Sequence, residues 1–244
     1  MQGLNALVTG GASGIGEACV RELAARGAKV TIADVDESAT TQLADEVAGT
    51  AWVLDLLETE SLASLTLDCD ILVNNAGIQV VSPLEHFPPE SFHRILMLML
   101  EVPFLLTRAA LPRMYERGFG RIINVSSVHG LRASKHKAAY VAAKHGLEGL
   151  SKVIALEGGP HGVTSNCVNP AYVRTPLVDK QVSDQAKANG IAEDDVVESV
   201  FMARNAIKRF VEPDEVARLV AWLASSEADM VTGASYTMDG GFTL

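Results

Sequence analysis

The sequence predicts an α/β fold, a Rossmann-type doubly wound parallel sheet of seven strands with helices on both faces. Short β-branched runs alternate with longer helical patterns along most of the chain, which is typical of a parallel sheet. Several of the short runs are nearly all apolar, as strands covered on both faces require. Because no Pro-, Gly- or Ser-rich linker interrupts the alternation, we expect residues 1–244 to form a single domain.

The expected elements follow one another in a regular order. Strand-like runs lie at residues 6–9, 30–33, 51–54, 71–74, 121–125, 164–168 and 235–238. Helical patterns lie between them at residues 14–26, 37–48, 89–116, 138–156 and 214–225, with a weaker one at 58–65. Residues 175–205 break the alternation, because they are polar, charged and only weakly periodic. They follow a predicted strand end, where open α/β sheets bind ligands, so we interpret them as a substrate lid; the alternative is a surface insertion.

The composition limits the class of protein. Hydrophobic residues make up 48% of the 244 residues, which is enough for a substantial core. A formal net charge of −10 argues against nucleic-acid binding, which needs a basic face. The three cysteines show no metal-ligand spacing, so we expect no metal site and a reducing compartment.

The chain carries no sequence signal for export or membrane insertion. Its N-terminus enters a strand pattern directly, without the features of a secretory signal. The most apolar run, residues 95–106, is broken by Glu101 and Pro103, and we take it as too short to span a bilayer. We therefore expect a soluble cytoplasmic protein that does not bind membranes.

A glycine-rich turn, TGGASGIG at residues 9–16, follows the first predicted strand and opens the first predicted helix. Glycines let the backbone approach a phosphate closely, and the N-terminus of a helix favours an anion. A glycine turn alone is weak evidence, but the strand before it and the helix after it favour dinucleotide binding. The candidate cofactor contacts in this turn are Gly10, Ser13, Gly14, Ile15 and Gly16.

Polar side chains follow the next strands at the same edge of the sheet. Asp34 ends the second strand, where a carboxylate accepts both ribose hydroxyls of NAD and repels the 2′-phosphate of NADP. No Arg or Lys in the glycine turn or just after Asp34 can bind that phosphate, so we expect NAD. Asp55 is expected to contact the adenine, and Asn75, Ala76 and Gly77 to order the backbone near the cofactor, although each alone could be a turn residue.

Residues 124–144 could form a proton-transfer centre. Tyr140 and Lys144 lie four apart on a predicted helix and therefore share a face. A tyrosine needs its pKa lowered by up to ~3 units, or ~4 kcal/mol, to act as a base near neutral pH. One ammonium ~4 Å away supplies on the order of 4 kcal/mol at an effective dielectric constant near 20. Ser127, with Ser126 as its rival, would hydrogen-bond the substrate oxygen; the alternative is a cap at a strand end.

A cluster of basic and imidazole side chains lies between Ser127 and Tyr140. Its members are His129, Arg132, Lys135, His136 and Lys137. In a chain with a net charge of −10, a small anionic substrate would explain such a cluster. The alternative is a loop whose charges face water, and we expect this for Lys135 and His136.

Six motifs, taken in order, resemble those of the short-chain dehydrogenase/reductase family. They are TGGASGIG (9–16), NNAG (74–77), Ser127, YVAAK (140–144), NP…VRTP (169–176) and DGG (239–241). The resemblance spans nearly the whole chain and implies an oxidoreductase in which Ser127 rather than Ser126, Tyr140 and Lys144 are catalytic. It further implies a homotetramer, and cofactor contacts from Tyr140, Lys144, Pro170, Val173 and Thr175.

Within the family, the chain is similar to the subgroup that oxidises (R)-3-hydroxybutyrate to acetoacetate with NAD. That subgroup binds the substrate carboxylate with four side chains, which here are Gln79, His129, Lys137 and Gln181. Ser127 and Tyr140 would bind the reacting oxygen. One alternative is another short-chain reductase, such as a 3-oxoacyl-carrier-protein reductase, against which Asp34 and the acidic composition argue. The other is a catalytically silent NAD-binding redox sensor, against which the intact catalytic residues argue.

The chain departs from the family pattern at a few positions. Met99 stands where the family usually has an Asn, at a backbone kink that holds a water of a proton relay. Residues 89–116 contain no Asn, so we hypothesise that a backbone carbonyl near Met99 holds this water. Ala171 replaces a preferred Gly, and Tyr172 and Phe242 replace Trp residues of the subgroup; these two aromatics either wall the pocket around a short acyl chain or simply pack.

Overall fold

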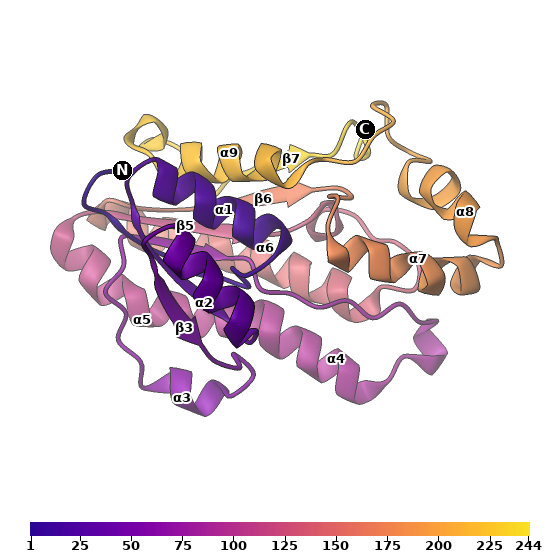
Figure 1. Cartoon of the computed structure of the whole chain (residues 1–244), viewed down its shortest axis with the longest axis horizontal. Helices are drawn as coiled ribbons and strands as arrows, with labels where there is room; N and C mark the ends of the chain where they lie inside the picture. Colours follow the sequence, from indigo (N-terminus) through magenta and orange to yellow (C-terminus); the bar gives the residue numbers. More distant parts are fainter.

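A computed structural model describes the backbone of residues 1–244 and all side chains except those of residues 176, 177, 179, 180 and 188. Its centre is a seven-stranded sheet in the order β3-β2-β1-β4-β5-β6-β7 (Figure 1). The strands are β1 Asn5–Thr9, β2 Lys29–Asp34, β3 Thr50–Val53, β4 Ile71–Asn74, β5 Gly120–Val125, β6 Val163–Pro170 and β7 Ser235–Met238. All six neighbouring pairs are parallel, which confirms the predicted fold class.

The strand order reverses at the middle of the sheet. The chain builds outward from β1 to β3, then returns to the other side of β1 with β4. Such a switch point leaves a crevice at the carboxyl ends of the two central strands, where open α/β sheets bind their ligands. The Thr9 hydroxyl at the end of β1 accepts hydrogen bonds from the backbone N–H groups of Asn75 (3.0 Å) and Ala76 (3.1 Å), which follow β4.

Helices cover both faces of the sheet, and each face has its own apolar core. The helices α1 Gly14–Ala25, α2 Glu37–Glu46 and α9 Pro213–Leu223 contribute to one core cluster. The helices α3 Thr59–Ala63, α5 Val102–Arg117 and α6 Ala138–Gly158 contribute to the other. Figure 1 shows α1 and α9 together on one side, with α4 and α5 on the opposite side. The predicted strands and helices are all present, with ends within two residues of those expected.

The helix α4 Pro89–Leu96 continues through a π-helical turn, Met97–Glu101, into α5. By length and composition alone, this 29-residue helix could cross a membrane, with 56% of its most apolar window buried in the fold. Our expectation that this apolar segment is too short to span a bilayer was therefore wrong by length, because the helix continues through Glu101 and Pro103. A proline lacks the N–H that a continuous helix needs, and the π turn accommodates that loss without ending the helix. The apolar side chains of α5 have a partner, because Leu106 and Met114 pack in the core beneath the sheet.

Residues 175–205 contain helices that the weak periodicity did not predict. They are α7 Pro176–Asn189, α8 Glu193–Val196 and a π-helical turn at Val197–Phe201. Figure 1 shows α7 and α8 at one end of the molecule. They have a small apolar cluster of their own, formed by Tyr172, Val178, Ala186, Val196, Phe201 and Met202. A cluster of this size is formed by few apolar side chains per helical turn, so the sequence of these helices shows only a weak hydrophobic periodicity. The lid predicted here includes the five side chains that lie outside the described residues.

Candidate active site

A cavity of about 460 Å³ opens at the carboxyl edge of the sheet. Almost every predicted cofactor, catalytic and substrate residue lines it: Gly10, Ser13, Gly14, Ile15, Asp34, Asp55, Asn75, Ala76, Gly77, Gln79, Ser127, His129, Lys137, Tyr140, Lys144, Pro170, Val173, Thr175 and Gln181. Gly16 does not line it. A Cβ at Gly16 would lie 2.0 Å from the carbonyl oxygen of Gly10, so close packing by itself requires a glycine at this position. A contact between Gly16 and a cofactor stays a prediction.

The glycine turn fits the phosphates of a dinucleotide. Gly10 has a positive φ of 60°, and a Cβ there would lie 2.8 Å from the Cα of Ala76. The turn therefore packs directly against the segment after β4. Ser13 precedes α1 in an extended conformation, and its side chain does not cap the helix. The first N–H groups of this 12-residue helix are thus left to bind an anion beside the cavity.

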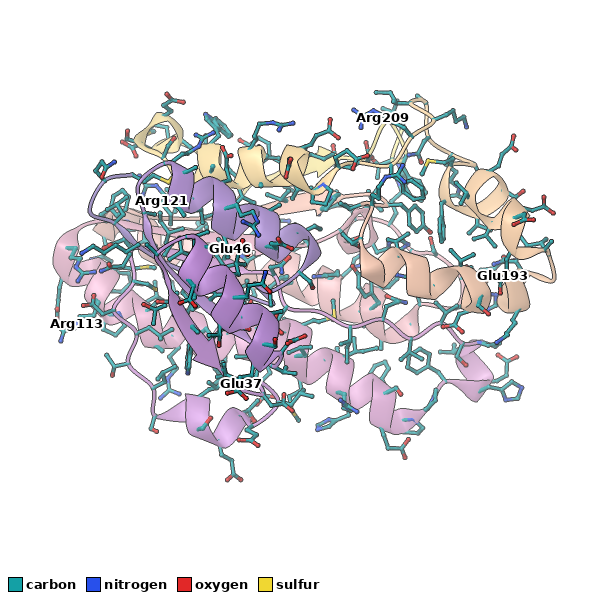
Figure 2. The ribbon with its side chains drawn as sticks, in the orientation of Figure 1. Glu37, Glu46, Arg113, Arg121, Glu193 and Arg209 are labelled. Carbon is teal, nitrogen blue, oxygen red and sulfur yellow. The ribbon has the colours of Figure 1, made fainter. Side chains whose placement is uncertain are left out.

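The Asp34 carboxylate at the end of β2 is held by three backbone N–H groups. It accepts hydrogen bonds from Ala12 (3.0 Å), Val35 (2.7 Å) and Asp36 (3.2 Å). A shallow hollow beside Val35 is lined by Asp36, Glu37 and Asp45 from the start and body of α2. Figure 2 shows Glu37 and Glu46 at the two ends of this helix. The surface next to Asp34 is acidic, which fits a ribose diol and disfavours a further phosphate.

Asn75 and Asp55 order backbone around the same cavity. The Asn75 amide donates to the carbonyl oxygens of Thr9 and Gly10, both at 2.9 Å, and so ties the segment after β4 to the glycine turn. The Asp55 carboxylate accepts a hydrogen bond from the N–H of Leu57 (2.9 Å). The role predicted for Asn75, ordering backbone, corresponds to these contacts.

Ser127, Tyr140 and Lys144 meet in the cavity. Ser127 caps a short turn, Val128–Gly130, where its hydroxyl accepts from the N–H of His129 at 3.1 Å. The Ser127 hydroxyl also interacts with Tyr140, whereas the Ser126 hydroxyl lies beside Gly130 and has no partner among the described atoms. This geometry favours Ser127 over Ser126.

Burial controls the charges of the catalytic pair. It raises the pKa of Tyr140, and the Ser127 hydroxyl opposes that shift. It lowers the pKa of Lys144 to about 8, while Cys167 and Glu148 oppose it. The Lys144 ammonium donates to the carbonyl of Val125 at 2.6 Å and lies 5.6 Å from the Tyr140 ring centre. In this arrangement desolvation sets the direction of the shift at Tyr140, because the Lys144 ammonium is directed at a backbone carbonyl.

Lys137 and His129 form a wall of the cavity beyond the catalytic pair, and Lys137 supplies its positive charge. Lys137 is only 4% exposed, and its Nζ lies 5.0 Å from the centre of the Tyr172 ring. Burial lowers the pKa of Lys137 to about 8, and no ion pair involves it in the described part of the chain. His129 is also 4% exposed, and its Nε2 has no hydrogen-bond partner among the described atoms. Burial, with help from Lys137, lowers the pKa of His129 to about 3, so its ring is neutral.

The rest of the basic cluster lies apart from this wall. Arg132 and Lys135 are exposed, and His136 is half-buried with a left-handed φ of 67°. The exposure of Lys135 matches the expectation that it faces water, whereas His136 is more buried than expected. Gln79 lines the cavity with its amide donated to the carbonyl of Val80 at 3.0 Å, and Gln181, on α7, is buried there.

Sequence reasoning missed several residues that line the cavity. Arg94 reaches it from α4, and Val178 from α7. Neither residue belongs to a recognisable sequence motif, because its position at the cavity depends only on the path of its helix. Tyr172 lines the cavity, as one of the two alternatives for it proposed. Phe242 instead packs near His129, with ring centres 6.4 Å apart.

Known proteins resemble this chain over its full length. A family model described as Enoyl-(Acyl carrier protein) reductase matches residues 10–243. The D-beta-hydroxybutyrate dehydrogenase of Rhizobium meliloti (strain 1021) is 43% identical, over 98% of each chain. The D-beta-hydroxybutyrate dehydrogenase of Cupriavidus necator is 41% identical, over 99% of this chain and 98% of its own. A solved short chain dehydrogenase/reductase family protein superposes with a TM-score of 0.87 at 33% identity, covering 98% of this chain and 97% of its own.

Proposed function

Because the chain belongs to the short-chain dehydrogenase/reductase family of oxidoreductases, we propose that it converts (R)-3-hydroxybutyrate and NAD⁺ to acetoacetate and NADH. The observation that carries the substrate assignment is the buried Lys137, which has no anionic partner in the described part of the chain and lies in the same cavity as Tyr140. The relatives from Rhizobium meliloti and Cupriavidus necator support the assignment by their names.

A buried ammonium without a counter-ion is costly, and a substrate carboxylate would compensate it. Among the described residues, the carboxylates that line the cavity are Asp34 and Asp55, which follow β2 and β3. His129 adds a neutral N–H donor, and Gln79 and Gln181 add amides without charge. Such a site should reject a neutral alcohol by roughly 10⁴-fold, since its polar groups would be left unpaired.

The catalytic side chains act on the carbinol group. Tyr140 takes the hydroxyl proton, and Ser127 donates a hydrogen bond to the same oxygen as carbonyl character develops. Lys144 provides a positive charge that favours tyrosinate, while its contact with Val125 fixes its position. When bound, NAD⁺ accepts the hydride from the substrate carbon.

The residues of the glycine turn and Asp34 fit NAD. Gly10, Ser13, Gly14 and Ile15 surround the N-terminus of α1, and Asp34 with the acidic start of α2 would repel the extra phosphate of NADP. We further propose that Pro170, Val173 and Thr175 contact the nicotinamide end, and that residues 175–205 act as a lid over the substrate, from which Gln181 reaches the carboxylate.

A cytoplasmic homotetramer stays part of the proposal. Phe104 on α5 and Leu156 on α6 are large apolar side chains exposed on the surface, as an interface between copies requires. Light scattering coupled to size exclusion would measure the mass in solution; a monomer would contradict the tetramer.

The test of the function is an absorbance assay for NADH. We expect turnover with (R)-3-hydroxybutyrate and NAD⁺, and little with the (S)-enantiomer, with butan-2-ol or with NADP⁺. Equal rates on butan-2-ol and hydroxybutyrate would overturn the carboxylate assignment. Equal rates with NADP⁺ and NAD⁺ would overturn the role of Asp34.

A further inference from the structure

Glu148 is a buried carboxylate that the proposed reaction does not use. It lies on α6, one turn after Lys144, and is only 5% exposed. No ion pair involves it in the part of the chain that the structure describes. An acid is rarely kept in such a place unless its charge or its hydrogen bonds have a use, because desolvation is costly.

We propose that Glu148 is a positioning residue for the dehydrogenase reaction, which fixes the backbone of Ser127 through Asn169 and keeps a negative charge behind Lys144. This inference rests on the proposed function, because it assigns a role relative to the reacting groups of that function. It adds a residue that touches neither substrate nor cofactor.

The first part of the role is mechanical. One oxygen of Glu148, Oε1, accepts a hydrogen bond from the Asn169 amide at 2.6 Å. The same amide nitrogen donates to the backbone carbonyl of Ser127 at 2.9 Å. The other oxygen, Oε2, accepts from the hydroxyl of Ser235 at 2.6 Å. Glu148 therefore joins α6, the end of β6 and the start of β7 to the residue that would bind the substrate oxygen.

The turn after Ser127 is shaped to pack against this carboxylate. A Cβ at Gly130 would lie 2.8 Å from Glu148 Oε1 and 2.5 Å from the Ser126 hydroxyl. Any larger residue at position 130 would push the turn away from α6. Both carboxylate oxygens of Glu148 accept hydrogen bonds, which is the pattern of an ionised group.

The second part of the role is electrostatic. Side chains four apart on a helix share a face, so Glu148 lies on the face of α6 that carries Lys144 and Tyr140. The groups that act on the charge of Lys144 are Cys167 from β6 and Glu148 itself, and both oppose the lowering of its pKa by burial. The titratable group of the packed turn, His129, is neutral. Asn169 and Ser235 contribute no charge, and burial raises the pKa of Cys167 so that its thiol is neutral. Glu148 is therefore the one ionised acid that acts on Lys144 among the described residues.

The sign of the effect follows from the charge. A negative charge holds protons on the Tyr140–Lys144 pair, so its removal lets the pair lose a proton at lower pH. Opposite charges on neighbouring side chains of one helix face shift each other's pKa by roughly one unit at an effective dielectric constant near 20. Glu148→Gln keeps the size and an acceptor for Asn169. It removes the charge and replaces the second acceptor with a donor, from which the Ser235 hydroxyl can accept after rotation.

The experiment compares pH profiles of kcat/KM for hydroxybutyrate oxidation. Glu148→Gln is expected to move both limbs of the profile to lower pH, by at least about half a unit. Asn169→Ala is expected to lower kcat about tenfold or more without moving the limbs, because it releases Ser127 but keeps the charge. Glu157→Gln, an exposed acid on the same helix, is the matched control and should leave both quantities unchanged.

The outcomes distinguish this inference from the proposed function. Unshifted limbs in Glu148→Gln, with a lowered melting temperature alone, would show a purely structural role and overturn the inference. If the wild-type protein does not oxidise hydroxybutyrate, the proposed function fails. The charge is then tested in the protein alone by near-ultraviolet difference titration of Tyr140, with Tyr140→Phe as the blank. An unchanged titration in Glu148→Gln would again overturn the inference.

Discussion

The replacement Lys137→Met should stabilise the protein while it destroys substrate binding. Burial lowers the pKa of Lys137 from 10.5 to about 8, which corresponds to ~3 kcal/mol of lost stability at neutral pH. Met has a similar length and no charge, so it removes this cost and keeps much of the packing against Tyr172. Part of the gain is offset by the loss of the cation–π contact with that ring, so we expect a stabilisation of about 1–3 kcal/mol.

The pH dependence of the free energy of unfolding tests the direction of this effect. The folded pKa of Lys137 lies below its unfolded value, so the unfolded chain binds more protons between pH ~8 and ~10.5. Wild-type stability should therefore gain a contribution as the pH rises through this window, and the advantage of Lys137→Met should shrink. Below pH 8 the ammonium is charged in both states, and the advantage should be constant.

The assay is urea unfolding at neutral and alkaline pH, at one protein concentration, because association between copies would change the measured stability. Lys135→Met, at an exposed position of the same loop, is the control and should change stability by less than about 0.5 kcal/mol. KM for hydroxybutyrate should rise steeply in Lys137→Met and stay unchanged in the control. A variant less stable than wild type at neutral pH would refute the reasoning, because Lys137 would then have an anionic partner within the protein itself.

Three further predictions concern other parts of the site. Asp34→Ser should raise the ratio of kcat/KM with NADP⁺ to kcat/KM with NAD⁺ by roughly 100-fold, since a like charge facing a phosphate costs several kcal/mol. An unchanged ratio in a steady-state assay would contradict the role of Asp34. His129→Leu should remove a loss of stability that the wild type shows as the pH falls from ~6.5 toward ~3. Burial lowers the pKa of His129 to about 3, so in that window this residue is protonated only in the unfolded chain. Acid unfolding followed by circular dichroism measures the midpoints, and identical midpoints for the two proteins would contradict the prediction. Met99→Asn should change kcat less than tenfold at constant KM; a larger increase would mean that wild type lacks a proton path.

The fold could be predicted from the sequence because its signals are local. Every residue of β4 and β5 is buried and both strands are rich in Ile, Leu and Val, as strands covered by helices on both faces require. Asp36 is a residue type that favours the start of a helix, and its carboxylate accepts from the N–H of Ala39 at 3.0 Å at the start of α2. The helices of residues 175–205 lacked such a signal, because their packing depends on a few contacts with Tyr172 and Phe201, whose rings stack 4.3 Å apart.

The substrate site depends on contacts that no local pattern contains. Lys135 and Lys137 are two residues apart in one loop, yet one is exposed and the other buried. What separates them is Tyr172, which follows β6 and reaches the ammonium of Lys137 from a distant part of the chain. The role of Glu148 is equally hidden from the sequence. On a helical wheel it is one polar residue of α6, and only its hydrogen bonds with Asn169 and Ser235, from two strands, explain why a charged side chain lies there.

The position of Met99 shows how a backbone feature can persist when the side chain associated with it has changed. In an α-helix the carbonyl of Met99 would accept from the N–H of residue 103, but residue 103 is a proline and has none. The sequence therefore prevents the regular bond at this one carbonyl, and the structure forms its π turn at Met97–Glu101. Met99 is buried and lines the cavity, and a Cβ at Gly77 would lie 3.3 Å from its methyl carbon. The thioether fills space beside the cofactor segment, while Pro103 disrupts the backbone hydrogen bonding. We hypothesise that this carbonyl, which cannot form the regular helix bond, accepts a hydrogen bond from a water, and we therefore expect Met99→Asn to add little.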